Sequence, residues 1–236
     1  MNKENIPELQ AFLDKELTRK ESVRVLEAGC GSACNVHLGE KAHLVGIDIS
    51  EKQLQRNTVL KEKILGDIQR YDLPSASFDI IICWDVLEHL PQPELALRRF
   101  ARAVKIDGLV ILKLPNVLSV KGLITKFLPH LFHVLAYRYI YGDKNAGKND
   151  TVPFKTYLRF SIAADAIKKM CARDGLRAVY FATWDVASSS WLQRKKLACS
   201  AYLTLKGIFK LLSLGRINDS EFILILQKAK PIAPRD

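Results

Sequence analysis

Short apolar runs alternate with segments of helical periodicity through the first half of the chain. The runs that predict strands are rich in Val, Ile and Leu and cover residues 23–29, 43–50, 61–68, 78–86 and 108–116. Between the last two runs, residues 91–105 carry apolar positions at helical spacing after a proline-rich start. Strands that are apolar on both faces and separated by helices indicate a parallel sheet with helices on both faces. The pattern therefore predicts an α/β fold.

The second half of the chain has a different pattern. Residues 161–176 predict an amphipathic helix with Ser161 as its N-cap and Gly175 at its C-terminal end. Two further apolar runs predict strands over residues 177–186 and 221–230. Between these strands lies a long amphipathic helical stretch, 188–219, that is rich in Lys and Leu. Residues 117–160 mix aromatic side chains, basic side chains and a polar loop.

Length and charge set the outer limits of the interpretation. The 236 residues fit one domain that can bury a sizeable core. The net charge is +11, because 36 Lys and Arg face 25 Asp and Glu, and the pI is near 9.4. Such a surplus favours nucleic acid, acidic lipid head groups or a phosphorylated substrate as partners. A soluble domain with a lysine-rich surface explains it equally well.

Cysteine usage and the N-terminal segment point to the cytoplasm. The five cysteines are scattered, and Cys30 and Cys34 have no second pair at the spacing of zinc ligands, so reduced thiols are the expectation. Residues 1–21 are polar and helix-like, without the apolar core of a signal peptide. No run of 18 uncharged apolar residues occurs that would span a membrane.

A glycine turn after the first predicted strand is the first chemical signal. Gly29-Cys30-Gly31 lets the backbone approach a ligand closely, although such glycines are often only turn formers. Asp48 ends the second predicted strand, where a carboxylate can accept both ribose hydroxyls or simply face water. Glu27 would repel a pyrophosphate but suits a cationic ligand. Since Ala33 stands where a dinucleotide fingerprint has its third glycine, a NAD-dependent oxidoreductase is disfavoured.

Taken together, several segments resemble those of the class I S-adenosylmethionine-dependent methyltransferases. The segments are 27–31, 46–50, 66–68, 78–89 and 113–116. They are most similar to the broad type 11/12 group, which includes ubiquinone-pathway and natural-product enzymes. The resemblance covers residues 23–116 and returns in 161–185 and 221–228. It implies a Rossmann-like fold with a mostly parallel seven-stranded sheet whose last strand is antiparallel, and S-adenosylmethionine as cofactor, with S-adenosylhomocysteine as product.

The resemblance also implies roles at the nucleoside end of the cofactor. Asp48 would hold the ribose hydroxyls, and Ile49 would pack on the adenine. Asp67 would accept a hydrogen bond from the exocyclic amine of the adenine, and the backbone amide of Ile68 would contact the ring. A turn residue after the third strand is the alternative reading of Asp67.

At the methionine end, the resemblance assigns the glycine turn and the end of the fourth strand. Glu27, Gly29, Cys30 and Gly31 would form the turn around the methionine, with Glu27 acting on the ammonium directly or through water. The backbone at Cys83 and Trp84 would face the same end. Beside Ala33, the sequence departs from the family in its short N-terminal segment. We therefore expect one domain, 1–236, with the cap supplied by a substrate-lid insert, 117–160, and a helical insert at 187–218.

Two histidines are candidate catalytic bases. His89 follows the fourth predicted strand and is nearest to the expected cofactor, although a contact at a helix start is the structural alternative. His133 lies three residues after His130 on one face of a predicted helix within the insert, where an exposed lid position is the alternative. Some relatives hold a divalent metal ion with a cluster that Asp85, Glu88 and His89 match in outline. Many relatives with this motif bind no metal, and we assign none.

The acceptor is the least determined part of the prediction. The loop typical of DNA base methyltransferases is absent, so nucleic acid is not the expected partner. We expect O-methylation of a small molecule, with a natural-product or lipid-linked acceptor among the options. An RNA methyltransferase that uses the basic surface and a non-catalytic binding or scaffold protein are the alternatives. Residues 191–216 form a basic amphipathic stretch that fits peripheral contact with the inner face of a membrane, a lid or a dimer contact, and the oligomeric state is open.

Overall fold

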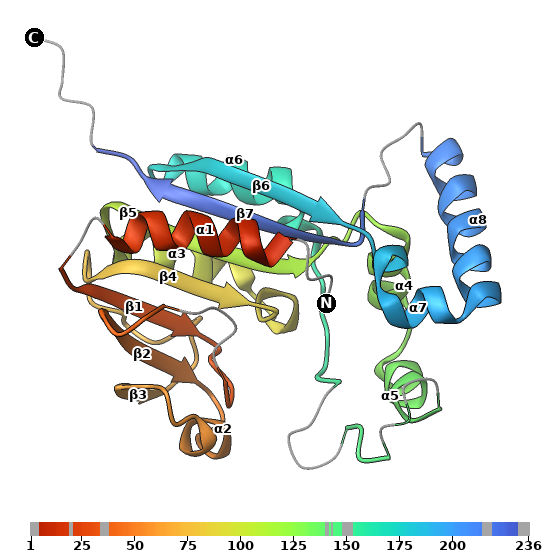
Figure 1. The fold of residues 1–236 in the computed structure, drawn as a ribbon, viewed down its shortest axis with the longest axis horizontal. Helices are drawn as coiled ribbons and strands as arrows, with labels where there is room; N and C mark the ends of the chain where they lie inside the picture. The colour runs from red at the N-terminus through yellow and green to blue at the C-terminus, as the bar shows by residue number, and fades with distance from the viewer. Residues whose placement is uncertain are drawn as a thin grey trace, which may run out of the picture.

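Seven strands form one sheet at the centre of the computed structural model, in the order β3-β2-β1-β4-β5-β7-β6 (Figure 1). The structure describes residues 5–18, 21–33, 38–139, 142, 144–147, 153–213 and 219–230. The strands are β1 (Val23–Ala28), β2 (Ala42–Asp48), β3 (Glu62–Leu65), β4 (Phe78–Trp84), β5 (Val104–Pro115), β6 (Leu176–Trp184) and β7 (Glu221–Lys228).

Helices and short 3-10 turns connect these strands. The helices are α1 (Asn5–Thr18), α2 (Glu51–Arg56), α3 (Pro93–Ala103), α4 (Val120–Phe127), α5 (His130–Tyr139), α6 (Ala164–Arg173), α7 (Ser190–Arg194) and α8 (Lys196–Leu212). The 3-10 turns are η1 (Leu87–His89), η2 (Phe160–Ile162) and η3 (Val186–Ser188). No helix in the described parts of the chain has the length and apolar content needed to cross a bilayer.

Strand direction confirms the predicted sheet. Pairs β1–β2, β1–β4, β2–β3 and β4–β5 are parallel, whereas β7 runs antiparallel to both β5 and β6. All seven residues of the central strand β4 are buried, which is why its sequence is a continuous apolar run rather than an alternating one. Parallel strands bring their carboxyl ends to one edge of the sheet, and a ligand site is expected outside that edge.

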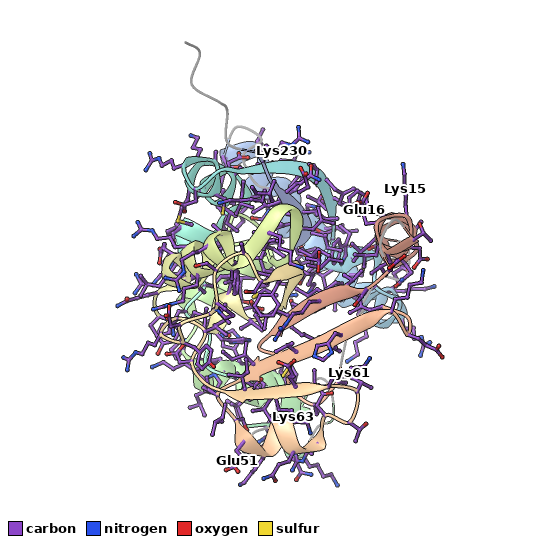
Figure 2. The ribbon with its side chains drawn as sticks, turned by 90° about the vertical axis from the view of Figure 1, so that its left-hand side faces the viewer. Lys15, Glu16, Glu51, Lys61, Lys63 and Lys230 are labelled. Carbon is purple, nitrogen blue, oxygen red and sulfur yellow. The ribbon has the colours of Figure 1, made fainter. Side chains whose placement is uncertain are left out.

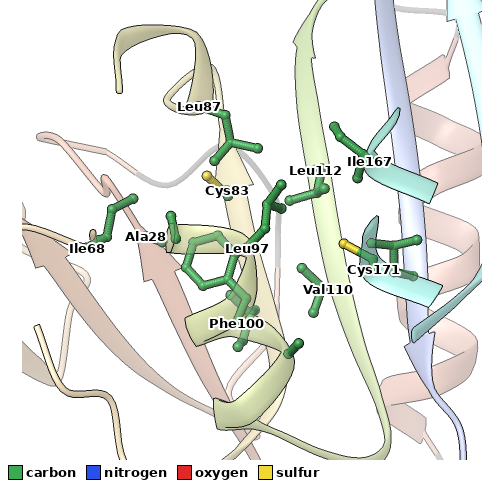
Figure 3. Close-up of a cluster of buried hydrophobic side chains, with 14 of the residues drawn as sticks. Ala28, Ile68, Cys83, Leu87, Leu97, Phe100, Val110, Leu112, Ile167 and Cys171 are labelled. Atoms are coloured by element: carbon green, nitrogen blue, oxygen red, sulfur yellow. The ribbon is translucent and has the colours of Figure 1, made fainter. Parts of the chain in front are cut away.

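The two faces of the sheet are covered by different helices. On one face, Leu97 and Phe100 of α3 pack with Ile167 and Cys171 of α6 over the central strands (Figure 3). On the other face, Leu9, Leu13 and Leu17 of α1 form a stripe of fully or almost fully buried side chains. Each such leucine stabilises the fold by about 1.5–3 kcal/mol. The N-terminal helix therefore serves the core, and it lies in front of the sheet (Figure 1).

Two local expectations need correction, and one is met. Ser161 is not an N-cap: α6 begins after Ala163, because η2 has already turned the chain through hydrogen bonds from Ile162 and Ala163 back to residues 159 and 160. Gly175 does end the helix, with a φ of +76°. In the described part of the stretch 188–219, the helix is not continuous: α7 and α8 are separated at Lys195.

The connection between β1 and β2 is described in part. The described residues there, 29–33 and 38–41, form turns and no helix. Residues 34–37, which include Cys34, lie outside the described residues.

Charged side chains are spread over the outside of the molecule. Figure 2 shows Lys61 and Lys63 at one end of the sheet and Lys15 and Lys230 toward the other. Lys63 lies in the edge strand β3, and Lys230 follows β7 near the opposite edge. These lysines do not form a single basic stripe of the kind that tracks a nucleic-acid backbone.

Candidate cofactor and active site

A pocket of about 470 Å³ opens at the carboxyl-terminal edge of the sheet. Its walls come from the turns after β1, β2, β3 and β4, together with side chains from residues 154–157. Seven of the predicted cofactor residues line it, namely Gly29, Gly31, Asp48, Ile49, Asp67, Ile68 and Trp84. The topology therefore gathers residues that are up to 55 positions apart in the sequence, as Gly29 and Trp84 are, around one cavity.

The glycine turn has a backbone that other residues adopt only with strain. Gly29 and Gly31 have φ angles of +71° and +53°. A Cβ on Gly29 would lie 2.4 Å from Cγ2 of Val86, whereas one on Gly31 would meet open space. Gly29 is thus needed for close packing against the turn after β4, and Gly31 leaves room on the pocket side.

Asn57 holds this turn from behind and was not singled out by the sequence patterns. Its side chain is fully buried, and its Nδ2 donates to the carbonyl oxygen of Gly31 at 3.3 Å and to that of Cys30 at 3.5 Å. Its Oδ1 accepts from the amide of Val59. The sequence shows only that position 57 is an asparagine, and this does not identify its hydrogen-bond partners.

Asp48 ties two of the pocket turns together. Its Oδ2 accepts from the amide of Gly31 at 2.9 Å, and its Oδ1 accepts from the amide of Ser50 at 2.8 Å. Each carboxylate oxygen retains a further lone pair that can accept from a ligand hydroxyl. Beside it, the Ile49 side chain is 75 % exposed and lines the pocket, so it offers an apolar surface on which a ligand can pack.

Asp67 is oriented by the residue two positions along the chain. Its Oδ1 accepts from the main-chain amide of Gln69 at 2.8 Å and from Nε2 of the same residue at 3.0 Å. Ile68, between them, is buried and lines the pocket. The pair therefore presents a fixed carboxylate and an apolar side chain on the β3 side of the cavity.

Three predicted residues do not line the pocket. Glu27 is 2 % exposed within β1, one position before the strand end. Cys30 and Cys83 are buried in the two apolar clusters on opposite faces of the sheet. Burial raises the pKa of the Cys83 thiol well above its ordinary value, with Glu88 and Asp85 adding to the effect. These cysteine side chains are core groups, so only their backbone remains available to a ligand.

His89 lies in the pocket wall with a defined ring orientation. Its Nδ1 is 2.9 Å from the carbonyl oxygen of Lys155, which can only accept, so Nδ1 carries the ring proton in this contact. The ring meets Phe154 edge-on, with 5.9 Å between centroids. Burial lowers the pKa of His89 below its ordinary value of 6.5. The neutral ring thus keeps a lone pair on Nε2.

The turn η1 fastens residues 154–158 to the pocket. The carbonyl oxygen of Glu88 accepts from the amides of Tyr157 at 2.8 Å and Leu158 at 3.0 Å. The Glu88 side chain is 4 % exposed, and its Oε2 has no hydrogen-bond partner. Burial, followed by the nearby Asp85 carboxylate, raises the pKa of Glu88 to about 8. This residue is therefore held protonated at neutral pH.

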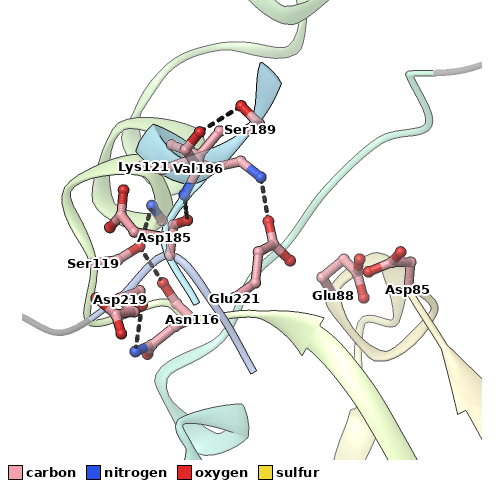
Figure 4. A network of polar contacts seen from close by, with 12 residues as sticks. Asp85, Glu88, Asn116, Ser119, Lys121, Asp185, Val186, Ser189, Asp219 and Glu221 are labelled. Carbon is pink, nitrogen blue, oxygen red and sulfur yellow. Dashed lines mark hydrogen bonds and ion pairs between the residues drawn. The ribbon is translucent and has the colours of Figure 1, made fainter. Parts of the chain in front are cut away.

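A buried lysine of β5 forms ion pairs with one residue of the pocket and one residue of the neighbouring strand β7. Lys113 Nζ lies 2.5 Å from Asp85 Oδ1 and 3.0 Å from Glu221 Oε2. Glu221 also pairs with Lys121 of α4, and Figure 4 places it between Lys121 and the Asp85–Glu88 pair. Burial lowers the pKa of Lys113, but the two carboxylates outweigh it and raise that pKa above its ordinary value.

This network bears on the metal alternative. Asp85 is occupied by Lys113, and the Nδ1 of His89 is directed to a main-chain carbonyl. Within the described ranges, no three His, Cys, Asp or Glu side chains converge on a point where they would hold a metal ion. The geometry therefore gives no support to a metal bound by Asp85, Glu88 and His89.

The second candidate base lies elsewhere. His133 belongs to α5, where its Nε2 is 3.2 Å from the carbonyl oxygen of Thr125, and its ring centroid is 6.5 Å from that of His130. It is not among the residues that line the pocket. The structure does not bring His133 to His89, and the helical spacing that suggested it reflects a position on α5 that contacts α4.

Comparison with known proteins agrees with this architecture. A family model described as a methyltransferase domain matches residues 26–112. The ubiquinone biosynthesis O-methyltransferase of Aromatoleum aromaticum is 30% identical over 169 residues, which are 65% of this chain and 63% of that protein. The protein of the same name from Thiobacillus denitrificans is 34% identical over 130 residues, 47% of this chain and 55% of that protein. The chain thus matches less than two thirds of the length of these relatives.

Solved structures share the fold at low sequence identity. A SAM-dependent methyltransferase from Archaeoglobus fulgidus has a TM-score of 0.54 at 16% identity, with 93% of both chains covered. Phosphoethanolamine N-methyltransferase 2 of Haemonchus contortus, solved with S-adenosyl-L-methionine, has a TM-score of 0.54 at 15% identity. That match covers 94% of this chain and 53% of the other. At these identities, the likeness concerns the fold alone.

Proposed function

We propose that this chain is a class I S-adenosylmethionine-dependent methyltransferase that transfers a methyl group from that cofactor to a hydroxyl oxygen of a small-molecule acceptor. One observation carries the proposal. The pocket holds the nucleoside-side residues Asp48, Ile49 and Asp67 on one wall and His89 on another. The relatives named as O-methyltransferases support oxygen as the methylated atom.

The residues present fit the cofactor. The pocket volume lies within the range of small-molecule sites. The two Asp48 oxygens can accept from the ribose hydroxyls, the exposed Ile49 can cover the adenine, and Asp67 can accept from its amine. Open space beside Gly31 leaves room for the methionine end. When bound, the cofactor supplies a methyl group on a positively charged sulfur.

His89 would take the proton that the acceptor must lose. Methylation of the acceptor oxygen would release its hydroxyl proton, and Nε2 of His89 would accept it. The carbonyl of Lys155 holds the Nδ1 proton, so the lone pair of the neutral ring is on Nε2, which lies 4.0 Å from Glu88 Oε1. Its lowered pKa keeps His89 in the accepting form at neutral pH. Phe154 and Tyr157 would exclude water and orient an aromatic or apolar acceptor.

Binding and transfer can be tested separately. Calorimetry should detect binding of S-adenosylmethionine and S-adenosylhomocysteine to the protein and its loss in Asp48→Ala. Incubation with labelled methyl donor and fractionated host extract should label a small molecule, and Asp48→Ala should abolish the label. Label found only in RNA would replace the small-molecule acceptor with RNA. Binding of NAD without binding of S-adenosylhomocysteine would overturn the proposal.

A further inference from the structure

Helix α8 contacts the rest of the protein through polar side chains, which is the reverse of the usual orientation of an amphipathic helix in a globular domain. Its polar anchors face the protein: Lys206 Nζ lies 2.7 Å from Asp185 Oδ2 and 2.9 Å from Asp219 Oδ1. The Tyr202 hydroxyl donates to the same Asp185 oxygen at 3.2 Å. An amphipathic helix normally packs its apolar side on the core and its charges toward water. Here a lysine and a tyrosine make the inward contacts.

The outward side of α8 is apolar. At 100° per residue, Leu197, Ile208 and Leu211 fall on one face, away from the anchors. Leu197 is 89 % exposed and Leu211 is 79 % exposed, and none of the helix residues is buried. Figure 1 shows α8 standing at the end of the molecule beyond the sheet, next to α4. Exposed apolar faces of this kind mark interaction surfaces.

The sequence around α8 is strongly basic, and the nearby carboxylates of Asp185 and Asp219 are already paired with Lys206. Residues 186–218 contain no Asp or Glu, but they contain six basic residues, namely Arg194, Lys195, Lys196, Lys206, Lys210 and Arg216. Residues 117–142, which include α4 and α5, also lack Asp and Glu. Large apolar side chains are exposed there too, such as Phe127 in α4 and Leu131 in α5. Apolar side chains flanked by lysines and arginines match an anionic lipid surface.

We propose that α8 docks this protein on the surface of an anionic phospholipid bilayer, with the leucine face inserted at the head-group boundary and Lys196, at the start of the helix, on the phosphates. A second copy of the chain fits less well, because a symmetric contact through α8 would bring its lysines against those of the partner. The proposal does not rest on the methyl-transfer chemistry, since none of the α8 side chains lines the pocket.

Vesicle co-sedimentation tests the docking with defined lipids. The full chain should bind vesicles of phosphatidylcholine and phosphatidylglycerol in equal amounts far better than vesicles of phosphatidylcholine alone, and salt should weaken the binding. The double variant Leu197→Glu with Leu211→Glu should lose binding by about tenfold or more, because it puts anionic groups on the inserted face. Lys196→Glu should weaken binding by about fivefold.

A matched control guards against non-specific effects. Ile106, half exposed in β5 on another part of the surface, can be changed to Glu, and this variant should bind vesicles as the wild type does. Urea denaturation should show that the double variant is folded. Equal binding by the double variant and the wild type would overturn the proposal. Absence of vesicle binding by the wild type would also overturn the proposal. This holds whether or not sedimentation velocity detects a dimer that the double variant no longer forms. Failure to methylate any acceptor would leave these results unaffected.

Discussion

Nδ1 of His89 lies 2.9 Å from the main-chain oxygen of Lys155, a residue 66 positions further along the chain. This contact sets the ring tautomer and also fastens the segment that contributes Phe154 and Tyr157 to the pocket. The proposed base and the acceptor wall are therefore positioned by one another. Changes at either should affect transfer more than cofactor binding.

The His89→Gln variant tests the base directly. We expect its turnover to fall by about 10²–10⁴-fold, as for the loss of a general base. The dissociation constant of S-adenosylmethionine from calorimetry should stay close to that of the wild type. Because the pKa of His89 is lowered below 6.5, wild-type turnover should decline only as the pH falls below that value. A variant that retained both full turnover and this acidic limb would exclude His89 as the base.

Glu88 should make the fold less stable as the pH rises. Its pKa is raised from 4.5 to about 8, so the folded state binds a proton that the unfolded state releases between these values. The stabilisation is fully present below pH 4.5 and is lost as the pH approaches 8. Glu88→Gln cannot ionise and should exceed the wild type in unfolding free energy at pH 8–9 by roughly 1–3 kcal/mol. Urea denaturation across this range measures the difference, which should shrink toward pH 5.

Lys113 should be difficult to remove alone. Lys113→Met leaves the Asp85 and Glu221 carboxylates near each other without their shared cation, and we expect a loss of about 3–5 kcal/mol in unfolding free energy. Adding Glu221→Gln should recover part of that loss, because one of the stranded charges is removed. Thermal or urea unfolding of the single and double variants gives the coupling. Additive effects would show that the network is energetically unimportant.

Asn57 should matter for cofactor binding although it is behind the pocket. Asn57→Ala removes the donor to the carbonyl oxygens of Cys30 and Gly31 and should cost about 1–3 kcal/mol of stability. The glycine turn would then be less well positioned, and calorimetry should find weaker binding of S-adenosylhomocysteine. Exposed Gln55 on the same helix offers a comparison, and Gln55→Ala should leave affinity unchanged.

Gly29 and Gly31 should differ in their tolerance of alanine. Both have positive φ, but only a Cβ at Gly29 meets Val86, at 2.4 Å. Gly29→Ala should therefore destabilise by about 2–4 kcal/mol and Gly31→Ala by about 1 kcal/mol. Combining Gly29→Ala with Val86→Ala should recover the steric part but leave the backbone strain. Equal costs for the two single variants would contradict this steric account.

Local sequence patterns correctly predicted much of the fold. The apolar runs identified all seven strands, and the signal was strongest where a strand is buried on both faces and needs a continuous apolar sequence, as in β4. Strand ends were less certain, and Ser161 was misplaced as a cap, because a 3-10 turn has the same local composition as a helix start. The resemblance at Gly29, Asp48 and Asp67 pointed to residues that line one pocket, because turns after strands are encoded locally.

Contacts between distant parts of the chain were decided by the tertiary structure alone. The sequence determined a parallel sheet, its glycine turn and its strand-end carboxylates, since periodicity and turn chemistry act over a few residues. It did not reveal that Asn57 supports the glycine turn, that Lys113 joins Asp85 to Glu221, or that α8 turns Lys206 inward. Each of these depends on which elements meet, and that is set by packing of the whole core rather than by neighbouring residues.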